Sequence, residues 1–453
     1  MSFNVALSGL NAAQKDLNVT SNNIANVNTI GFKESRAEFV DVYASSLLSG
    51  GKTKAGDGVL TSQVAQQFSQ GSIQFTQNSL DLAITGSGFY ATVPGIDSLE
   101  KSYTRAGQFK LNDDNFVVNS GGGYLLGFPV NDDGSSAAVS LSTANPIRVP
   151  TESGAPQFTT EVDVRMNLPA GDSYITGAPL NFDPTDPLTF NNSTSVTIFD
   201  SLGDSRVMTY YFVKDDPAVN PNQWLVFTAI DGSPIDIDDA GAPAAELAAA
   251  DGRVTAGGLK GGRLEFNNSG DFISITPTTG FTTVPLGGTI LANGADPAQI
   301  VTVDFNLDTA GPNPNEPTQF ASSFEVTSLS QDGLAVGRLT GIDISSDGLI
   351  RATFSNGTSR PLSRIALVSF ANEQGLTQIG GTSWRESLDS GTPLAGEAGS
   401  GTFGSINSKA LEQANVNLTT ELIDLISAQR NFQANSRALE VDNQLNQTIL
   451  QIR

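Results

Sequence analysis

The sequence contains neither cysteine nor histidine. Their absence excludes disulfides, thiolate zinc sites, cysteine nucleophiles, histidine-dependent triads and imidazole proton shuttles. Carboxylate pairs could still catalyse glycoside hydrolysis, but their separation is a three-dimensional quantity and the sequence singles out no pair. We therefore expect no enzyme, with no catalytic residues, no cofactor-binding residues and no metal ligands.

Signals for membranes and nucleic acids are also lacking. The N-terminus has no basic region, no continuous apolar run and no small-residue cleavage site, so it does not read as a cleaved signal peptide. No run of about eighteen apolar residues predicts a membrane span. The formal net charge of −23 disfavours binding to nucleic acids or anionic membranes, which reward clustered Lys and Arg. We expect neither nucleic-acid partners nor membrane insertion.

Proline is missing from both chain ends, and glycine is missing from the C-terminal end. All prolines fall between Pro94 and Pro393, and no glycine follows Gly404. Apolar residues recur every seven positions at the front, and with a three-to-four spacing from about residue 416 onward. We predict paired terminal helices forming a coiled-coil-like domain, weakly ordered alone and ordered when bundled with copies of the chain. The predicted polymerisation seam consists of Phe3, Leu7, Leu10, Leu17, Ile24, Leu418, Leu422, Leu425, Phe432, Leu439, Leu445 and Ile449.

The chain between these helices reads as mostly β, so the expected fold class is α+β with nested all-β domains. Alternating apolar residues at 162–168, and apolar runs at 196–213 and 224–230, predict strands and a hairpin. Residues 342–350 echo 109–117 in spacing, which suggests one sheet domain interrupted by another. We predict a helical domain (1–33 and 405–453), a connecting region (34–70 and 371–404), a discontinuous β domain (71–145 and 326–370) and an inserted outer β domain (146–325). Residues 44–58 read as a mobile loop.

Two partial ligand motifs are weak. Residues 86–91 match a dinucleotide fingerprint, G-x-G-x-x-A, but Pro94 and Gly95 follow where a helix should begin, so a strand, a tight turn and a second strand are favoured. Asp236 and Asp238 match the start of a calcium loop, yet Leu247 stands where the bidentate glutamate is needed. We interpret these carboxylates as solvating an exposed surface.

The end of the first helix carries a longer motif. It comprises Asn23, Ile24, Ala25, Asn26, Thr29, Gly31, Phe32 and Lys33, preceded by Leu7-Ser8-Gly9-Leu10-Asn11-Ala12. This run closely resembles the signature of the bacterial flagellar rod, hook and hook-associated axial proteins. Segments at 81–91, 103–109, 124–127, 399–404, 410–418 and 428–436 are similar to the same family. The hook members are the best match, because rod proteins look too short to hold an insertion of about 180 residues.

The resemblance implies a structural subunit of the flagellar hook: a helical tubular homopolymer that acts as a flexible universal joint, transmits torque from rod to filament and encloses the export channel. Its implied partners are further copies of itself, the rod distal protein, the hook cap protein, the hook-filament junction protein and the flagellar type III export apparatus. The implied location is the extracellular hook, reached without a cleaved signal peptide. The alternatives are a distal rod or hook-filament junction protein and, less favoured, a secreted β-rich adhesin or hydrolase.

The tails also have a face rich in side-chain amides, which is either an ordinary solvated helix face or the lining of such a channel. These amides are Asn4, Asn11, Gln14, Asn18 and Asn22 at the front, and Gln429, Gln433, Asn443, Gln444, Asn446, Gln447 and Gln451 at the back.

Overall fold

The computed structural model describes residues 2–42, 56, 58–247, 252–305 and 316–451. Most of the loop expected at 44–58 therefore lies outside the described residues. The chain divides into two compact units, one formed by Met1–Thr151 with Leu339–Arg453 and the other by Glu152–Arg338. The second unit is thus inserted into the sequence of the first. The four-part division predicted above stays a prediction.

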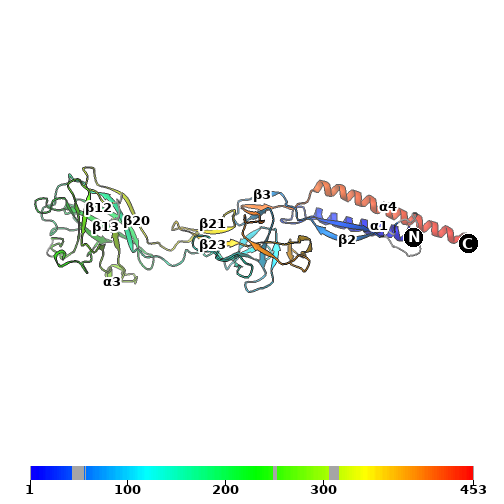
Figure 1. Cartoon of the computed structure of the whole chain (residues 1–453), viewed down its shortest axis with the longest axis horizontal. Helices are drawn as coiled ribbons and strands as arrows, with labels where there is room; N and C mark the ends of the chain where they lie inside the picture. The colour runs from blue at the N-terminus through cyan, green and yellow to red at the C-terminus, as the bar shows by residue number, and fades with distance from the viewer. Residues whose placement is uncertain (1, 43–55, 57, 248–251, 306–315, 452–453) are drawn as a thin grey trace. The chain divides into compact units, whose positions relative to one another are not determined.

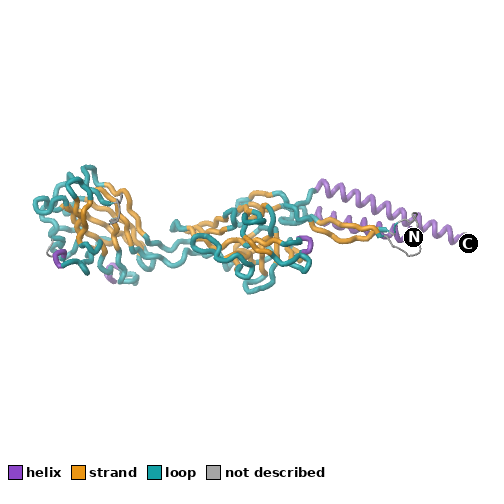
Figure 2. Tube along the Cα trace, viewed as in Figure 1, coloured by secondary structure: helices purple, strands orange, loops and turns teal. Residues whose placement is uncertain are grey.

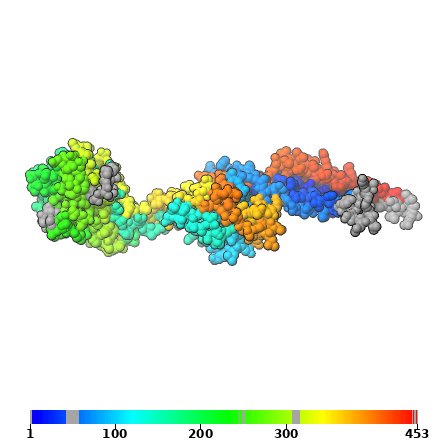
Figure 3. Space-filling model, viewed as in Figure 1, coloured from blue at the N-terminus to red at the C-terminus, as the bar shows by residue number. Residues whose placement is uncertain are grey.

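Two long helices, α1 (Ser2–Ala25) and α4 (Leu418–Gln451), lie side by side and run in opposite directions (Figure 1). Asn417 caps α4, because its Oδ1 accepts the backbone N–H groups of Thr419 and Thr420 at 3.0 and 3.3 Å. In the space-filling view α4 covers one side of α1 (Figure 3). A second side of α1 packs on the antiparallel pair β1 (Ser35–Asp41) and β2 (Val59–Gln66).

A 13-stranded sheet forms the body of the first unit. Its main path runs β21-β22-β23-β9-β5-β6-β26-β25, and buried apolar side chains pack on its faces. The echo between 342–350 and 109–117 falls within this one sheet. The strands are β5 (Phe89–Val93), β6 (Ser102–Thr104), β7 (Phe109–Leu111), β8 (Val117–Asn119), β9 (Tyr124–Phe128), β10 (Asn145–Pro146), β21 (Leu339–Ile344), β22 (Leu349–Phe354), β23 (Ser359–Ile365), β24 (Leu367–Ser369), β25 (Thr377–Gly380), β26 (Ser383–Arg385) and β27 (Leu394–Gly396).

The segment 371–404, predicted above as part of a connecting region, contributes strands to this sheet. After a short 3-10 helix, η2 (Glu373–Gly375), strand β26 pairs with β6, and β27 pairs with β24. The reason is visible at Trp384, whose ring is buried against Phe68, Phe89 and the rest of one apolar cluster. A large buried aromatic side chain fixes its strand in the core, and the isolated tryptophan gave no periodic signal in the sequence.

Two short antiparallel pairs join the chain leaving α1 to the chain entering α4. Strand β3 (Ile73–Phe75) pairs with β29 (Ala410–Glu412), and β4 (Leu82–Thr85) pairs with β28 (Ser405–Ser408). Segments more than 300 residues apart in the sequence therefore run together between the helices and the sheet.

The second unit is built from a 6-stranded and a 4-stranded sheet (Figure 2). The alternating residues of 162–168 are buried in its main core, as the pattern predicts for a half-buried strand, and the expected hairpin is the pair β12–β13. Its elements are β11 (Glu161–Asn167), β12 (Asn192–Phe199), β13 (Ser205–Lys214), β14 (Gln223–Ile230), β15 (Ser233–Ile235), η1 (Ala244–Glu246), β16 (Gly262–Phe266), β17 (Phe272–Thr276), β18 (Phe281–Thr282), α3 (Gly287–Ile290), β19 (Thr302–Asp304) and β20 (Glu325–Gln331).

The prediction of a mostly β chain with few helices is confirmed. Of the helices in the described residues, none combines the length and the apolar character needed to cross a bilayer.

Candidate assembly surface of the helical tails

On α1, small and polar side chains spaced three and four residues apart form the contact with α4. A Cβ atom added to Gly9 would lie 2.8 Å from Asn435 Oδ1, so the two backbones approach closely at this point. Ala13 and Ala428 are buried beside it. We call this contact the inner stripe: Ala6, Gly9, Ala13, Asp16, Thr20 and Asn23 on α1, with Glu421, Leu425, Ala428, Phe432, Asn435 and Leu439 on α4.

The predicted seam does not coincide with the inner stripe. On α4 the seam members Leu425, Phe432 and Leu439 are half-buried and belong to the inner stripe. On α1 the inner stripe consists of smaller residues instead. The half-buried members on α1 are Leu10, Leu17 and Ile24, and the exposed members are Phe3, Leu7, Leu418, Leu422 and Leu445. The side chain of Ile449 lies outside the described part of the chain. One chain therefore leaves five of the eleven described seam members exposed and buries the other six only in part.

Four aliphatic side chains form an exposed group at the start of α4, which we call the outer patch. They are Leu418, Leu422, Ile423 and Ile426, with exposed fractions of 44%, 45%, 60% and 50%. The two isoleucines were missed by the sequence reasoning, which assigned each helix one stripe. Aliphatic side chains this close together on an unpartnered helix face are typical of a surface that another protein covers.

The signature residue Asn23 connects three elements. Its Nδ2 donates to the Ser35 carbonyl of β1 at 2.8 Å and to Glu421 Oε1 of α4 at 3.2 Å. Its Oδ1 accepts the Ser35 N–H at 3.0 Å. A buried amide that is satisfied only in this arrangement fixes the register of α1 against both neighbours.

Gly31 allows the chain to turn after α1. Its φ of +69° lies in the left-handed region, and an added Cβ would lie 2.5 Å from the Ala106 backbone nitrogen. Both conditions require glycine. Its N–H donates to the Glu412 carbonyl at 2.9 Å, which joins the end of the signature to the segment entering α4.

Lys33 ends the signature inside a buried ionic cluster. Its Nζ lies 2.7 Å from Glu412 Oε1, and Arg105 Nη1 lies 3.2 Å from Glu412 Oε2. The lysine and glutamate side chains are 1% and 0% exposed. Burial lowers the pKa of Lys33, while the Glu412 carboxylate acts in the opposite direction. Three segments that the sequence showed separately thus meet at one carboxylate, and no local pattern could reveal that they are partners.

Acidic groups gather where α1, α4 and the start of β1 meet. Burial raises the pKa of Glu421, against the hydrogen bond from Asn23, and the carboxylates of Glu34, Asp424 and Asp16 raise it further. Burial and Asp424 likewise raise the pKa of Asp16. The helix contact therefore contains electrostatic repulsion at neutral pH.

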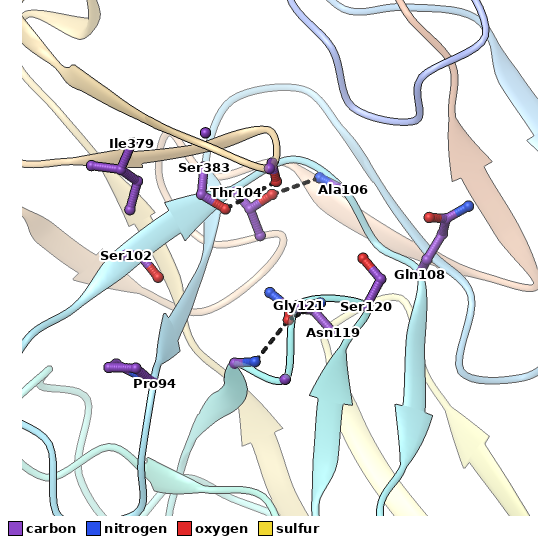
Figure 4. A pocket seen from close by; sticks show the side chains of 14 residues that line it. Pro94, Ser102, Thr104, Ala106, Gln108, Asn119, Ser120, Gly121, Ile379 and Ser383 are labelled. Atoms are coloured by element: carbon purple, nitrogen blue, oxygen red, sulfur yellow. Dashed lines mark hydrogen bonds between the residues drawn. The ribbon is translucent and has the colours of Figure 1, made fainter.

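The cavity in Figure 4 lies at one end of the large sheet and has a volume of about 360 Å³. Its described lining residues include hydroxyls, amides and glycines but no charged side chain. Thr104 Oγ1 accepts the Ala106 N–H at 3.0 Å, and Asn119 Oδ1 accepts that of Gly121 at 3.0 Å. These polar groups serve the turns that carry them.

Family models match most of the chain. Their descriptions are "Flagella basal body rod protein" (residues 3–33), "Flagellar hook protein FlgE/F/G D1 domain" (83–165), "Flagellar basal body protein FlaE D2 domain" (167–334) and "Flagellar basal body rod FlgEFG protein C-terminal" (407–452). Flagellar hook protein FlgE of Escherichia coli (strain K12) is 33% identical, and that of Salmonella typhimurium is 34% identical, each over 100% of both chains. The chain belongs to the flagellar hook protein FlgE family. This is a family of structural proteins and not of enzymes.

A crystal structure of the Helicobacter pylori flagellar hook protein FlgE2 aligns with a TM-score of 0.47 and 16% identity, covering 75% of this chain and 100% of that one. This likeness is too weak to add to the family assignment. The matches at 3–33 and 407–452 span α1 with its signature, and Glu412 with α4. The inner stripe, the outer patch, Lys33 and Glu412 therefore lie in matched segments, and Arg105 lies in the match at 83–165.

Proposed function

We propose that this FlgE-family chain is the structural subunit of the bacterial flagellar hook and polymerises into a helical tube through its terminal helices. The observation that carries the proposal is the open apolar surface of the tails, in a chain whose relatives are hook proteins over their whole length. The inner stripe is small and polar on α1, and it leaves Leu418, Leu422, Phe3 and Leu7 uncovered. Copies that cover these residues in a head-to-tail manner would repeat without closing into a ring.

The tube would transmit torque from rod to filament and bend as it turns. In this proposal the helices pack in a coiled-coil-like manner with those of neighbouring copies and form the stiff inner layer. The acidic β units form the outer layer, where small polar contacts break and re-form at little cost as the tube rotates. Cross-linking neighbouring β units should therefore straighten or stiffen the polymer, and unchanged bending would count against this mechanism.

The amide-rich helix face would line the export channel. Gln429, Gln433 and Gln444 are exposed on α4, as are Asn11 and Asn18 on α1. Neutral amides attract passing polypeptide less strongly than apolar or charged side chains, so an unfolded substrate would slide past them. An image of the polymer that resolves which residues face the lumen tests this assignment.

The further partners we propose are the rod distal protein below the hook, the cap protein during growth, the junction protein above, and the type III apparatus that exports the chain to the cell exterior. Matches to hook proteins over 100% of both chains favour the hook over a rod or junction role.

Electron microscopy of the purified chain at increasing concentration tests the proposal. We expect tubes from the full chain and none from a chain lacking α1 and α4. A full chain that stays monomeric at every concentration, or a trimmed chain that still forms tubes, would overturn it.

A further inference from the structure

The side chain of Glu412 joins the segments that connect the helical tails to the sheet. Besides Lys33 and Arg105, it accepts the Gly71 N–H at 2.9 Å through Oε1. Lys33 Nζ also donates to the Ser69 carbonyl at 2.7 Å, and Arg105 Nη2 donates to the Gly86 carbonyl at 2.8 Å. One buried carboxylate and its two cations thus hold five separate stretches of chain.

The three residues of the cluster lie in the segments that link the helical tails to the sheet. Lys33 follows the end of α1 by eight residues, and Glu412 precedes the start of α4 by six. Arg105 directly follows β6 of the large sheet. Glu412 is the carboxylate that bonds both cations, and it therefore lies between the base of both helices and the sheet.

We propose that Glu412 is a positioning residue that fixes the direction in which the helical tails leave the sheet. Charge-assisted hydrogen bonds to two cations constrain both carboxylate oxygens in distance and angle. Because the pair is buried, salt does not screen it as it screens a surface pair. The backbone pairs β3–β29 and β4–β28 join the strands at this base, and the cluster ties them to the end of the signature and to the sheet.

The consequence for the polymer rests on the function proposed above. If the helices form the inner tube and the sheets the layer around it, torque passes between them through this joint. A subunit with a loosened joint would still present its outer patch, so it would still assemble. Its polymer would bend more easily.

The substitution Glu412→Gln tests the role of the carboxylate. Glutamine keeps the size of the side chain but replaces one acceptor oxygen with an amide group, which would meet the lysine or the arginine. Glu412→Asp keeps the charge and shortens the reach. Glu386→Gln is the matched control, because Glu386 is an exposed carboxylate of the same unit that accepts a hydrogen bond from Tyr103 at 2.9 Å.

The readout is the width of the distance distribution between two spin labels in the full chain. The sequence has no cysteine, so Lys15→Cys on α1 and Lys110→Cys on β7 take unique labels at exposed positions. We expect a narrow distribution in the parent chain, at least a twofold broader one in E412Q, an intermediate one in E412D, and no change in E386Q. Circular dichroism should show the same strand content in all four, which separates a positioning role from loss of the fold.

If E412Q does not fold, Arg105→Lys replaces it, because lysine keeps the charge but cannot hold both Glu412 and the Gly86 carbonyl. A broad distribution in the parent chain, or equal widths in the parent, E412Q and R105K, would overturn the proposal. The bending stiffness of polymers, measured from electron micrographs, then tests the mechanical consequence. Because the labels report on the unassembled chain, failure of the hook proposal and failure of the joint are separate results.

Discussion

Removing one side chain from the outer patch should weaken assembly without weakening the fold. Leu422 is 45% exposed, and fully burying a leucine contributes about 1.5 to 3 kcal/mol. Covering its exposed part with a neighbouring chain would thus contribute roughly 0.7 to 1.4 kcal/mol. A tenfold change in an equilibrium constant corresponds to about 1.4 kcal/mol, so Leu422→Ser should raise the critical concentration for polymerisation roughly 3- to 10-fold.

The whole patch sets the upper limit of the effect. The exposed fractions of its four residues amount to about two whole aliphatic side chains, worth about 3 to 6 kcal/mol when covered. Replacing all four with serine should raise the critical concentration by roughly two to four orders of magnitude, which abolishes assembly at practical concentrations. The replaced surface is open in the single chain, so the unfolding temperature of the β units should not change.

Sedimentation at a series of protein concentrations measures the critical concentration directly. Leu99→Ser is the matched control, because Leu99 is a leucine of the same unit that is 91% exposed but stands apart from the helices. The reasoning is refuted if Leu422→Ser assembles at the parent concentration, or if Leu99→Ser is impaired equally.

Three further predictions concern the contact between the two helices and the turn that follows α1. Gly31→Ala should destabilise the first unit by more than the roughly 1 to 2 kcal/mol that a left-handed alanine costs, because the added Cβ meets the Ala106 backbone. Urea unfolding measures the loss of stability, and a smaller loss would contradict the close approach of the two segments. Asn23→Ala leaves the buried hydrogen-bond partners of Asn23 unsatisfied and should cost roughly 1 to 3 kcal/mol per lost hydrogen bond. Hydrogen exchange of the amides in α1 measures this loss. Unchanged protection of these amides would show that other residues fix the register of α1. The raised pKa values of Asp16 and Glu421 mean that the folded state binds protons more tightly than the unfolded state, so helix content should rise as the pH falls from neutral towards 4.5. Asp16→Asn should reduce this rise. A fall in helix content over the same pH range would contradict the prediction.

Much of the fold follows from local patterns. Both helices lie where proline is missing, and the alternating residues of β11 are buried as expected. Trp384 shows where this reasoning ends: its strand is three residues long, and only its burial in the core of the sheet places it there. Strands this short carry too few residues for a period to be seen, so tertiary packing decides them.

The candidate site was less predictable, because its partners are far apart in the sequence. The signature marked Asn23 and Lys33 as important, but Glu421 and Glu412 come almost 400 residues later. Burial cannot be inferred from an isolated glutamate, which is usually exposed. The predicted seam stays a prediction for contacts between copies. It does not describe the contact within one chain, because hydrophobic periodicity favours the largest apolar residues, whereas close helix contact at Gly9 needs small ones.

The two helices contact each other through the inner stripe and not through the more apolar outer patch, and the chemistry of the two surfaces suggests a reason. The inner stripe gives register but modest affinity, because its larger residues Leu425, Phe432 and Leu439 are only half-buried and the carboxylates of Asp16 and Glu421 oppose the contact. The aliphatic residues of the outer patch remain exposed in the single chain, where another molecule can cover them. If Leu418 and Leu422 faced α1, the pair of helices would be more stable in the single chain. It would then gain less stability from contact with a neighbouring copy. The inner stripe thus supplies specificity, and the outer patch supplies affinity. The apolar surface is therefore buried in the assembled state and not in the single chain.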